Sequence, residues 1–171
     1  VFGGDRSNEF AQRSSGASYE EIAAQGGGIQ ATVEATRATS SEQLLTWGLA
    51  RLDAMMARGV TCVEIKSGYG LDLDTELKML SVAQDLNEQH PIRVVRTFLG
   101  AHTVPKEQMF GRTAYIDKVC NEMIPAVAEA GLADFCDVFC EQGVFTVPES
   151  RRVLETGLTH GLRPKLHAEQ L

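Results

Sequence analysis

Side chains that could bind a metal ion or move a proton occur in this sequence directly after stretches of apolar residues. His102 follows one such stretch, and His167 ends another, with Glu169 and Gln170 just beyond it. A neutral imidazole is a common ligand of zinc, iron and manganese, and a carboxylate beside it can orient the ring or carry a proton. These residue types indicate metal-binding or acid–base chemistry, and a structural histidine is the alternative at each position.

Three further residues could hold a ligand. Arg6 follows two glycines in a turn, where its guanidinium could bind a carboxylate through two hydrogen bonds or form a surface ion pair. Tyr69 stands between Gly68 and Gly70, and a tyrosine used only for packing rarely needs a flexible residue on both sides. Tyr19 lies in a polar stretch and could close over a ligand or anchor that stretch.

The elements that must position these residues are predicted by apolar periodicity and by capping residues. Apolar, β-branched runs predict strands at 61–66, 92–99, 133–140 and 163–168. We expect the first of them to be a buried strand, because Cys62, Val63 and Ile65 are apolar. Helical spacing predicts helices at 40–59, 74–88, 113–130 and 146–161. Pro125 lies inside the third helix and predicts a kink or a break there.

Strands that alternate with helices in this way form parallel βα units, so the fold class is α/β. A doubly wound sheet and a (β/α)8 barrel both satisfy the pattern. The barrel is favoured because every predicted strand ends in polar residues, and a barrel gathers all those ends in one mouth. We therefore expect residues 1–171 to be a partial (β/α)8 TIM-type barrel, from the end of the first barrel strand to the fifth.

Residues 7–39 are the least periodic part of the chain. They are polar, rich in glycine and serine, and include a run of three glycines at 26–28. We expect a long loop here, with a short helical turn near 19–24. Long loops in compact domains are usually functional, which makes this stretch a candidate lid.

Composition limits the partners and the location. The net charge of -7 and a pI near 5.1 argue against nucleic acid or a membrane surface as partner, and leave a small-molecule substrate. No apolar run approaches the roughly 20 residues of a membrane span, and no signal segment opens the chain, so we expect a cytoplasmic protein. The oligomeric state stays open, with a homodimer among the possible assemblies.

Several motifs together resemble the imidazolonepropionase family of metal-dependent amidohydrolases. They are VFGGDR, EIKSGYGLDLDTELKML, TFLGAH, DVFCE followed by GVF, and KLHAEQL, and they span nearly the whole chain. The resemblance implies an amidohydrolase barrel with one zinc or iron ion. It also implies hydrolysis of the cyclic amide of 4-imidazolone-5-propanoate to N-formimino-L-glutamate by metal-activated water, a step of histidine degradation.

The resemblance also implies roles for individual residues. His167 matches the metal ligand of the fifth barrel strand, and Arg6, Tyr69 and His102 match residues that hold the substrate, with Tyr19 a further candidate. Some family members have an acid where this chain has Gln170, which leaves open whether Glu169, Gln170 or a residue outside the chain moves the proton. We expect Gln170 to hydrogen-bond the substrate. The family's other metal ligands are not in this chain, so we expect the chain alone to be inactive.

Two alternatives remain at this stage. Another amidohydrolase, such as a deaminase of a small heterocycle, would use the same His167 site with a different ring. A non-catalytic barrel module would use the polar residues at the strand ends only to satisfy one another.

Overall fold

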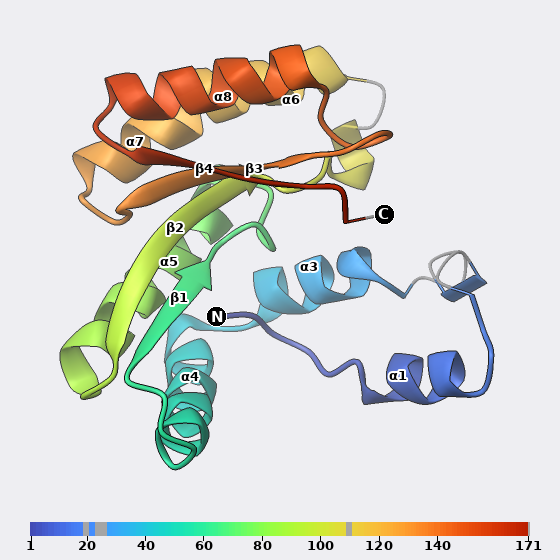
Figure 1. Ribbon diagram of the computed structural model, residues 1–171, viewed down its shortest axis with the longest axis vertical. Coiled ribbons are helices and arrows are strands. Elements are labelled where there is room, and N and C mark those ends of the chain that lie inside the picture. The colour runs from blue at the N-terminus through green and yellow to red at the C-terminus, as the bar shows by residue number, and fades with distance from the viewer. Residues whose placement is uncertain (19–20, 23–26, 109–110, 171) are drawn as a thin grey trace.

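A parallel β-sheet forms the centre of the molecule (Figure 1). The computed structural model describes residues 1–18, 21–22, 27–108 and 111–170. Within them the four strands lie in sequence order, and they are β1 (Cys62–Lys66), β2 (Arg93–Ala101), β3 (Phe135–Cys140) and β4 (Arg163–Ala168). Each strand lies where the sequence predicted it, and the α/β class is confirmed.

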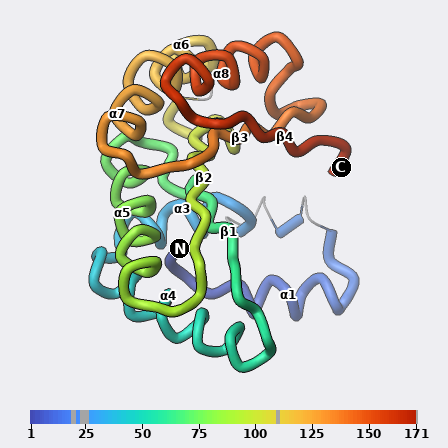
Figure 2. The backbone as a smooth tube through the Cα atoms, turned by 60° about the vertical axis from the view of Figure 1, so that its left-hand side comes forward, coloured from blue at the N-terminus to red at the C-terminus, as the bar shows by residue number. Residues whose placement is uncertain are grey.

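Helices join successive strands and pack on one face of the sheet (Figures 1 and 2). α4 (Ser41–Met56) precedes β1, α5 (Leu73–Gln89) joins β1 to β2, and α8 (Val147–Thr159) joins β3 to β4. Each of these helices starts after a residue whose side chain accepts a backbone N–H three positions on, and these caps are Ser40, Asp72 and Thr146. Local capping chemistry thus sets where each helix begins.

The helical segment between β2 and β3 is interrupted, as Pro125 predicted. α6 (Arg112–Lys118) continues into a π-helical turn, η2 (Val119–Met123), before α7 (Ile124–Glu129) resumes the α-helix. Proline has no N–H for the bond to the carbonyl four residues earlier, and its ring crowds that carbonyl. The wider π turn accommodates both effects without ending the helix.

Residues 7–39 do not form the long loop that we expected. They contain α1 (Ser7–Ser14) and α3 (Ile29–Ala38). The buried side of α3 includes two threonines beside one valine, so apolar periodicity in the sequence is weak there. The Thr36 hydroxyl accepts the backbone N–H of Gly3 at 2.9 Å, which explains how a threonine is buried in this position.

Lys78 of α5 attaches the end of α3 to the sheet layer. Its ammonium donates to the carbonyls of Thr36, Arg37 and Thr39 at 3.0, 3.1 and 2.9 Å. These carbonyls lie at the C-terminus of α3, where unpaired acceptors and the helix dipole both favour a cation. A contact across some 40 residues of sequence therefore completes α3.

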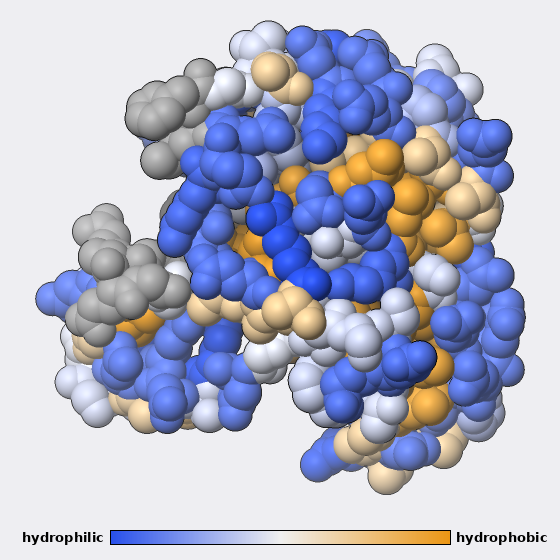
Figure 3. Space-filling model, turned by 180° about the vertical axis from the view of Figure 1, so that it is seen from behind, coloured by the Kyte–Doolittle hydropathy of each residue, from blue (hydrophilic) through white to orange (hydrophobic). Residues whose placement is uncertain are grey.

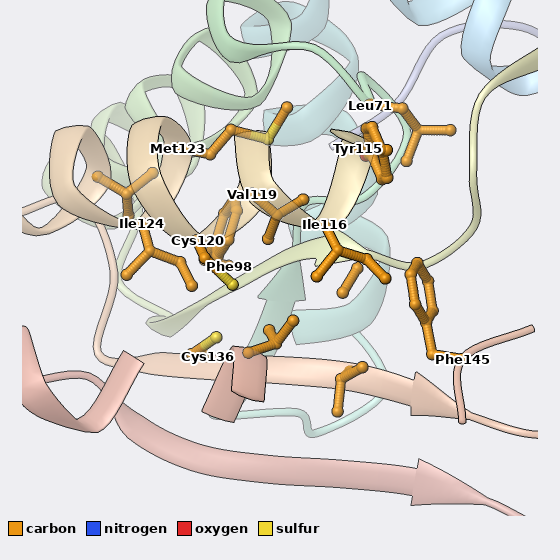
Figure 4. Packing of buried hydrophobic residues seen from close by; sticks show 14 of the residues in the cluster. Leu71, Phe98, Tyr115, Ile116, Val119, Cys120, Met123, Ile124, Cys136 and Phe145 are labelled. Carbon is orange, nitrogen blue, oxygen red and sulfur yellow. The ribbon is translucent and has the colours of Figure 1, made fainter. Parts of the chain in front are cut away.

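The larger of the two hydrophobic clusters lies between the sheet and the helices that follow β2 (Figure 4). Phe98 of β2 and Cys136 of β3 point toward Tyr115, Val119 and Met123, and all five side chains are fully buried. A smaller cluster packs β1 and β2 against α4 and α5, and its members include Leu44, Leu52, Val82, Leu86, Ile92 and Val94. Between them the two clusters cover the helix-facing side of all of β1 to β3.

The expectation of a buried first strand was wrong in part. Cys62 and Glu64 of β1 are exposed, while Val63 and Ile65 are half-buried against the smaller cluster. In the described residues β1 has a neighbour only on the β2 side, because it lies at the edge of the sheet. Its apolar side chains therefore bury only the face that meets α4 and α5.

The surface mixes apolar and polar groups. On the face opposite that of Figure 1, apolar side chains gather toward one side of the molecule between hydrophilic ones (Figure 3). None of the helices in the described part of the chain has the length and apolar character needed to cross a bilayer.

Candidate active site

Aromatic and imidazole rings from neighbouring strands lie together at the carboxyl edge of the sheet. The ring of Tyr69, just after β1, meets that of His102 edge-on with centroids 5.2 Å apart. The centroid of His102, just after β2, lies 6.2 Å from that of His167 on β4. Phe139 of β3 stacks on His167 with centroids 4.7 Å apart. Three of the residues singled out in the sequence thus share one site.

Asp137 of β3 orients His167. Its carboxylate oxygens lie 3.1 and 3.2 Å from Nδ1 of His167, and the Asp137 side chain is fully buried. An ionised carboxylate can only accept, so Nδ1 is the donor in this contact, and in the neutral form of the ring the lone pair is on Nε2. Sequence reasoning missed this residue, although an acid in the apolar strand ADFCDVFC was a signal that a buried partner must exist.

Lys66, the last residue of β1, balances the buried charge of Asp137. Its ammonium donates to the same carboxylate, which also accepts the backbone N–H of Val138 at 2.8 Å. A buried carboxylate is costly unless it is paired and hydrogen-bonded, and Asp137 meets both conditions. The strand ends are therefore connected by charge as well as by ring contacts.

A second polar layer lies one step further down the strands. Glu64 of β1 accepts from Lys165 of β4 at 2.6 Å and from Thr97 of β2 at 2.5 Å. Burial opposes the ionisation of Glu64, but these hydrogen bonds and the nearby charges of Lys66 and Lys165 outweigh it and lower its pKa. The face of the sheet turned away from the helices is thus charged and internally paired.

His102 is held in one tautomer. Its Nδ1 lies 2.9 Å from the carbonyl oxygen of Gly68, so Nδ1 donates and Nε2 is the free acceptor. Burial is the main cause that lowers the pKa of His102 below 6.5, so the ring is neutral at pH 7.

The end of β2 places the His102 side chain. The strand register shifts between Phe98 and Ala101, just before His102, and the buried hydroxyl of Tyr115 donates to the carbonyl oxygen of Gly100 at 2.7 Å. The register shift and this hydrogen bond together direct the His102 side chain into the site.

The loop that carries Tyr69 needs both of its glycines. Gly68 has a φ of 94°, and a Cβ there would lie 2.7 Å from the carbonyl oxygen of Leu99. A Cβ on Gly70 would lie 2.7 Å from the Cβ atom of Thr75. Burial raises the pKa of Tyr69 above its usual value, so its hydroxyl stays a hydrogen-bond donor near neutral pH.

Arg6 lies at the rim of the site and is engaged in an ion pair. Its guanidinium contacts the Glu9 carboxylate at 2.7 and 2.8 Å, and the Arg6 side chain is 43% exposed. Arg6 and Tyr69 line one hollow of about 420 Å³ together with Phe2, Gly3, Gly4, Asp5 and Arg51. Of the two roles that the sequence left open for Arg6, the structure shows the surface ion pair. This pair lies beside the hollow that Arg6 shares with Tyr69.

The two polar residues beyond β4 do not touch the rings through any contact that the structure shows. Glu169 is exposed and has a φ of 54°, a left-handed conformation that is uncommon for a residue other than glycine. The backbone N–H of Gln170 donates to the Glu141 carboxylate at 2.8 Å. Tyr19 and most of the helical turn expected near 19–24 lie outside the described residues.

The described residues contain no set of three His, Cys, Asp or Glu side chains placed to hold a metal ion. His167 nevertheless fits one corner of such a site. A histidine that binds a metal through one nitrogen usually donates from the other to a carboxylate or carbonyl, and Asp137 provides that carboxylate.

Three curated proteins similar to this chain share one name. The imidazolonepropionase of Paraburkholderia phymatum is 56% identical over all 171 residues, and those of Brevibacillus brevis and Haloarcula marismortui are each 54% identical. The resemblance found in the motifs thus extends over the whole chain. The chain spans 42%, 40% and 40% of the lengths of these three relatives.

Two other comparisons add little. No family model matches the chain. A solved dipeptide epimerase from Methylococcus capsulatus aligns with 76% of this chain, over 45% of its own length, at 12% identity. Its TM-score of 0.29 is too low to support an inference about the fold.

Proposed function

We propose that this chain is part of an imidazolonepropionase, which hydrolyses the cyclic amide of 4-imidazolone-5-propanoate to N-formimino-L-glutamate in histidine degradation. Identity above 50% to imidazolonepropionases along all 171 residues carries the proposal. The ring cluster at the strand ends supports it, because it joins residues from several parts of that match. A cytoplasmic location and a small-molecule substrate, without a nucleic acid or membrane partner, belong to the same proposal.

The proposed fold of the complete protein is a (β/α)8 barrel, with this chain running from the end of the first strand to the fifth. Two observations support it. The strands follow one another in order without a switch point, and the helices pack on one face of the sheet. A doubly wound sheet would have helices on both faces. The charged inner face would then line the barrel, with the rings at its mouth.

Through its Nε2, His167 would hold one metal ion, zinc or iron. Such an ion supplies a nucleophile for amide hydrolysis by lowering the pKa of a bound water. Asp137 would accept the Nδ1–H of His167, and the ammonium of Lys66 pairs with the same carboxylate. The remaining ligands would come from other parts of the complete protein.

The substrate would lie between His167 and the hollow lined by Arg6 and Tyr69. Arg6 would exchange the carboxylate of Glu9 for the propionate group, since both bind a guanidinium in the same way. Neutral His102 would accept a ring N–H through Nε2, and it could donate to the carbonyl oxygen only after taking up a proton. Tyr69 and Tyr19 would fix the ring and tail in a reactive orientation.

The proton needed by the leaving nitrogen is assigned to the segment after β4. Glu169 is exposed, carries an acid–base group and follows His167 closely in the chain. Gln170 cannot titrate, so it would hydrogen-bond the substrate while Glu169 moves the proton.

The test follows the ultraviolet absorbance of imidazolonepropionate with the complete parent protein, before and after a chelator strips its metal. Decay that stops on stripping and returns with zinc or iron is expected. His167→Ala should remove both metal and decay, whereas His160→Ala, an exposed histidine at the end of α8, should change neither. A folded, metal-loaded parent that leaves the absorbance constant would overturn the proposal and direct attention to a deaminase reaction.

A further inference from the structure

Glu76 is a fully buried carboxylate that the proposed chemistry does not use. It lies in the first turn of α5, and its side chain has no exposed surface. Its oxygens accept backbone N–H groups at 2.9 to 3.1 Å, and the donors are Gly68, Gly70 and Leu71. The Ser67 hydroxyl also donates to it. Every donor belongs to residues 67–71, the loop that carries Tyr69.

Glu76 is not needed to start its own helix. Asp72 caps α5 by accepting the N–H of Thr75 at 2.8 Å. A carboxylate one turn further along would normally face solvent in this position. Its burial is explained by the loop, whose N–H groups would otherwise be buried without partners.

The loop conformation depends on this carboxylate. Gly68 and Leu71 both have positive φ values, 94° and 59°, and Leu71 pays a steric cost that glycine does not. These dihedrals turn the N–H groups of Gly68, Gly70 and Leu71 toward one point, where Glu76 accepts them. Complete burial raises the pKa of Glu76, and the hydrogen bonds from the loop oppose that shift.

Gly68 connects Glu76 to the candidate site. Its N–H is bound by both oxygens of Glu76 at 3.1 and 2.9 Å, and its carbonyl accepts Nδ1–H of His102 at 2.9 Å. Tyr69, the next residue, places its ring against His102. A shift of the loop would therefore move the acceptor that sets the His102 tautomer and the tyrosine ring at the same time.

We propose that Glu76 is a positioning residue, which holds the 67–71 loop so that Gly68 keeps His102 in its Nδ1–H tautomer and Tyr69 stays against it. The effect on the tautomer is a property of the fold alone. The effect on turnover rests on the proposed function.

The test compares Glu76→Gln with Asp74→Asn in the complete parent protein. Asp74 is an exposed carboxylate in the same helical turn, so its replacement is a matched control. The glutamine amide brings a donor against loop N–H groups, which displaces the loop. We expect ¹⁵N NMR of histidine-labelled protein to show His102 leaving the Nδ1–H tautomer in Glu76→Gln only, with His102→Gln identifying its signal.

Kinetics give the second readout. Glu76→Gln should lower kcat/KM by roughly 10- to 100-fold, as displaced positioning groups do, while Asp74→Asn leaves it unchanged. A folded Glu76→Gln with the wild-type His102 signal would overturn the proposal. If Glu76→Gln does not fold, amide hydrogen exchange of the wild-type protein tests the proposal instead. Fast exchange of the Gly68, Gly70 and Leu71 amides would then overturn the proposal. A parent without hydrolase activity would defeat the proposed function and leave the NMR result intact.

Discussion

Lys66, Asp137 and His167 come from three different strands, and their side chains form one chain of charge at the site. The Asp137 carboxylate has a cation on one side and an imidazole N–H on the other. Replacing it would leave Lys66 without its counter-charge and His167 free to change tautomer. At the scale of single residues, Asp137 therefore acts on the site through its contacts with Lys66 and His167.

Asp137→Asn should weaken metal binding by the complete parent protein roughly 10- to 100-fold, because the partners that orient a ligating histidine typically contribute that much. Chelator competition followed by metal analysis measures it without reference to activity. Asp134→Asn is the control, since Asp134 lies just before the same strand and accepts from the Arg96 N–H at 3.2 Å, away from His167. Equal metal affinity of Asp137→Asn and wild type would contradict the assigned role.

At the scale of elements, a bidentate ion pair joins α6 to α8, beside a second pair between Asp117 and Arg152. Arg112 donates to the two carboxylate oxygens of Glu149 at 2.8 and 2.9 Å, and Glu149 also completes the capping box with Thr146 at the start of α8. The Arg112 hydrogen bond is the main cause that lowers the pKa of Glu149 from 4.5 to about 2. Both helices cover the sheet behind the site, so this pair supports its scaffold.

The depressed pKa of Glu149 predicts a pH-dependent contribution to stability. Because the folded pKa lies below the unfolded one, the contribution is complete above pH 4.5 and is lost as the pH falls toward 2. Glu149→Gln should therefore lower the stability of the parent protein by about 1–2 kcal/mol at pH 7 and by progressively less below pH 4.5. Thermal unfolding between pH 7 and 2.5 measures the difference.

Glu155→Gln is the matched control for that experiment. Glu155 lies on the same helix, is 67% exposed and only approaches Arg151 at 3.8 Å. Its replacement should change the unfolding temperature little at any pH. A difference between Glu149→Gln and wild type that stayed constant down to pH 2.5 would show that ionised Glu149 is not its source.

At the scale of the whole molecule, the described sheet has two strands with a neighbour on one side only. β1 and β4 lie at its edges, and the inner face between them carries the Glu64–Lys165 and Lys66–Asp137 pairs. Open strand edges present unpaired N–H and C=O groups to other chains. Leu166 and Val147 add apolar surface near the β4 edge, being 55% and 65% exposed.

The isolated 171-residue chain should therefore self-associate and bind zinc weakly. The edge strands β1 and β4 can pair with strands of other copies of the chain. The described residues contain no set of three side chains placed to hold a metal ion. Light scattering over a range of concentrations and metal analysis after gel filtration test both points, with the complete parent protein as reference. A monodisperse monomer that retains stoichiometric zinc would refute the expectation.

Much of the fold was readable because its signals are local. Capping by Ser40, Asp72 and Thr146 and the break at Pro125 each depend on residues within one or two helical turns. The residues of 7–39 were misread for a related reason. The helix α3 is completed by contacts with Gly3 and Lys78, which no local pattern shows.

The sequence by itself determined the four strands to within two residues at each end, the starts of the helices that precede and connect them, and the positions of Tyr69, His102 and His167 at the strand ends. Periodicity and capping act over a few residues, so they can be read directly from the chain. Only the tertiary structure decided the partners of the buried carboxylates. Asp137 meets Lys66 across 71 residues and His167 across 30, and a buried charge selects its partner by proximity in the folded state, where water no longer competes for it.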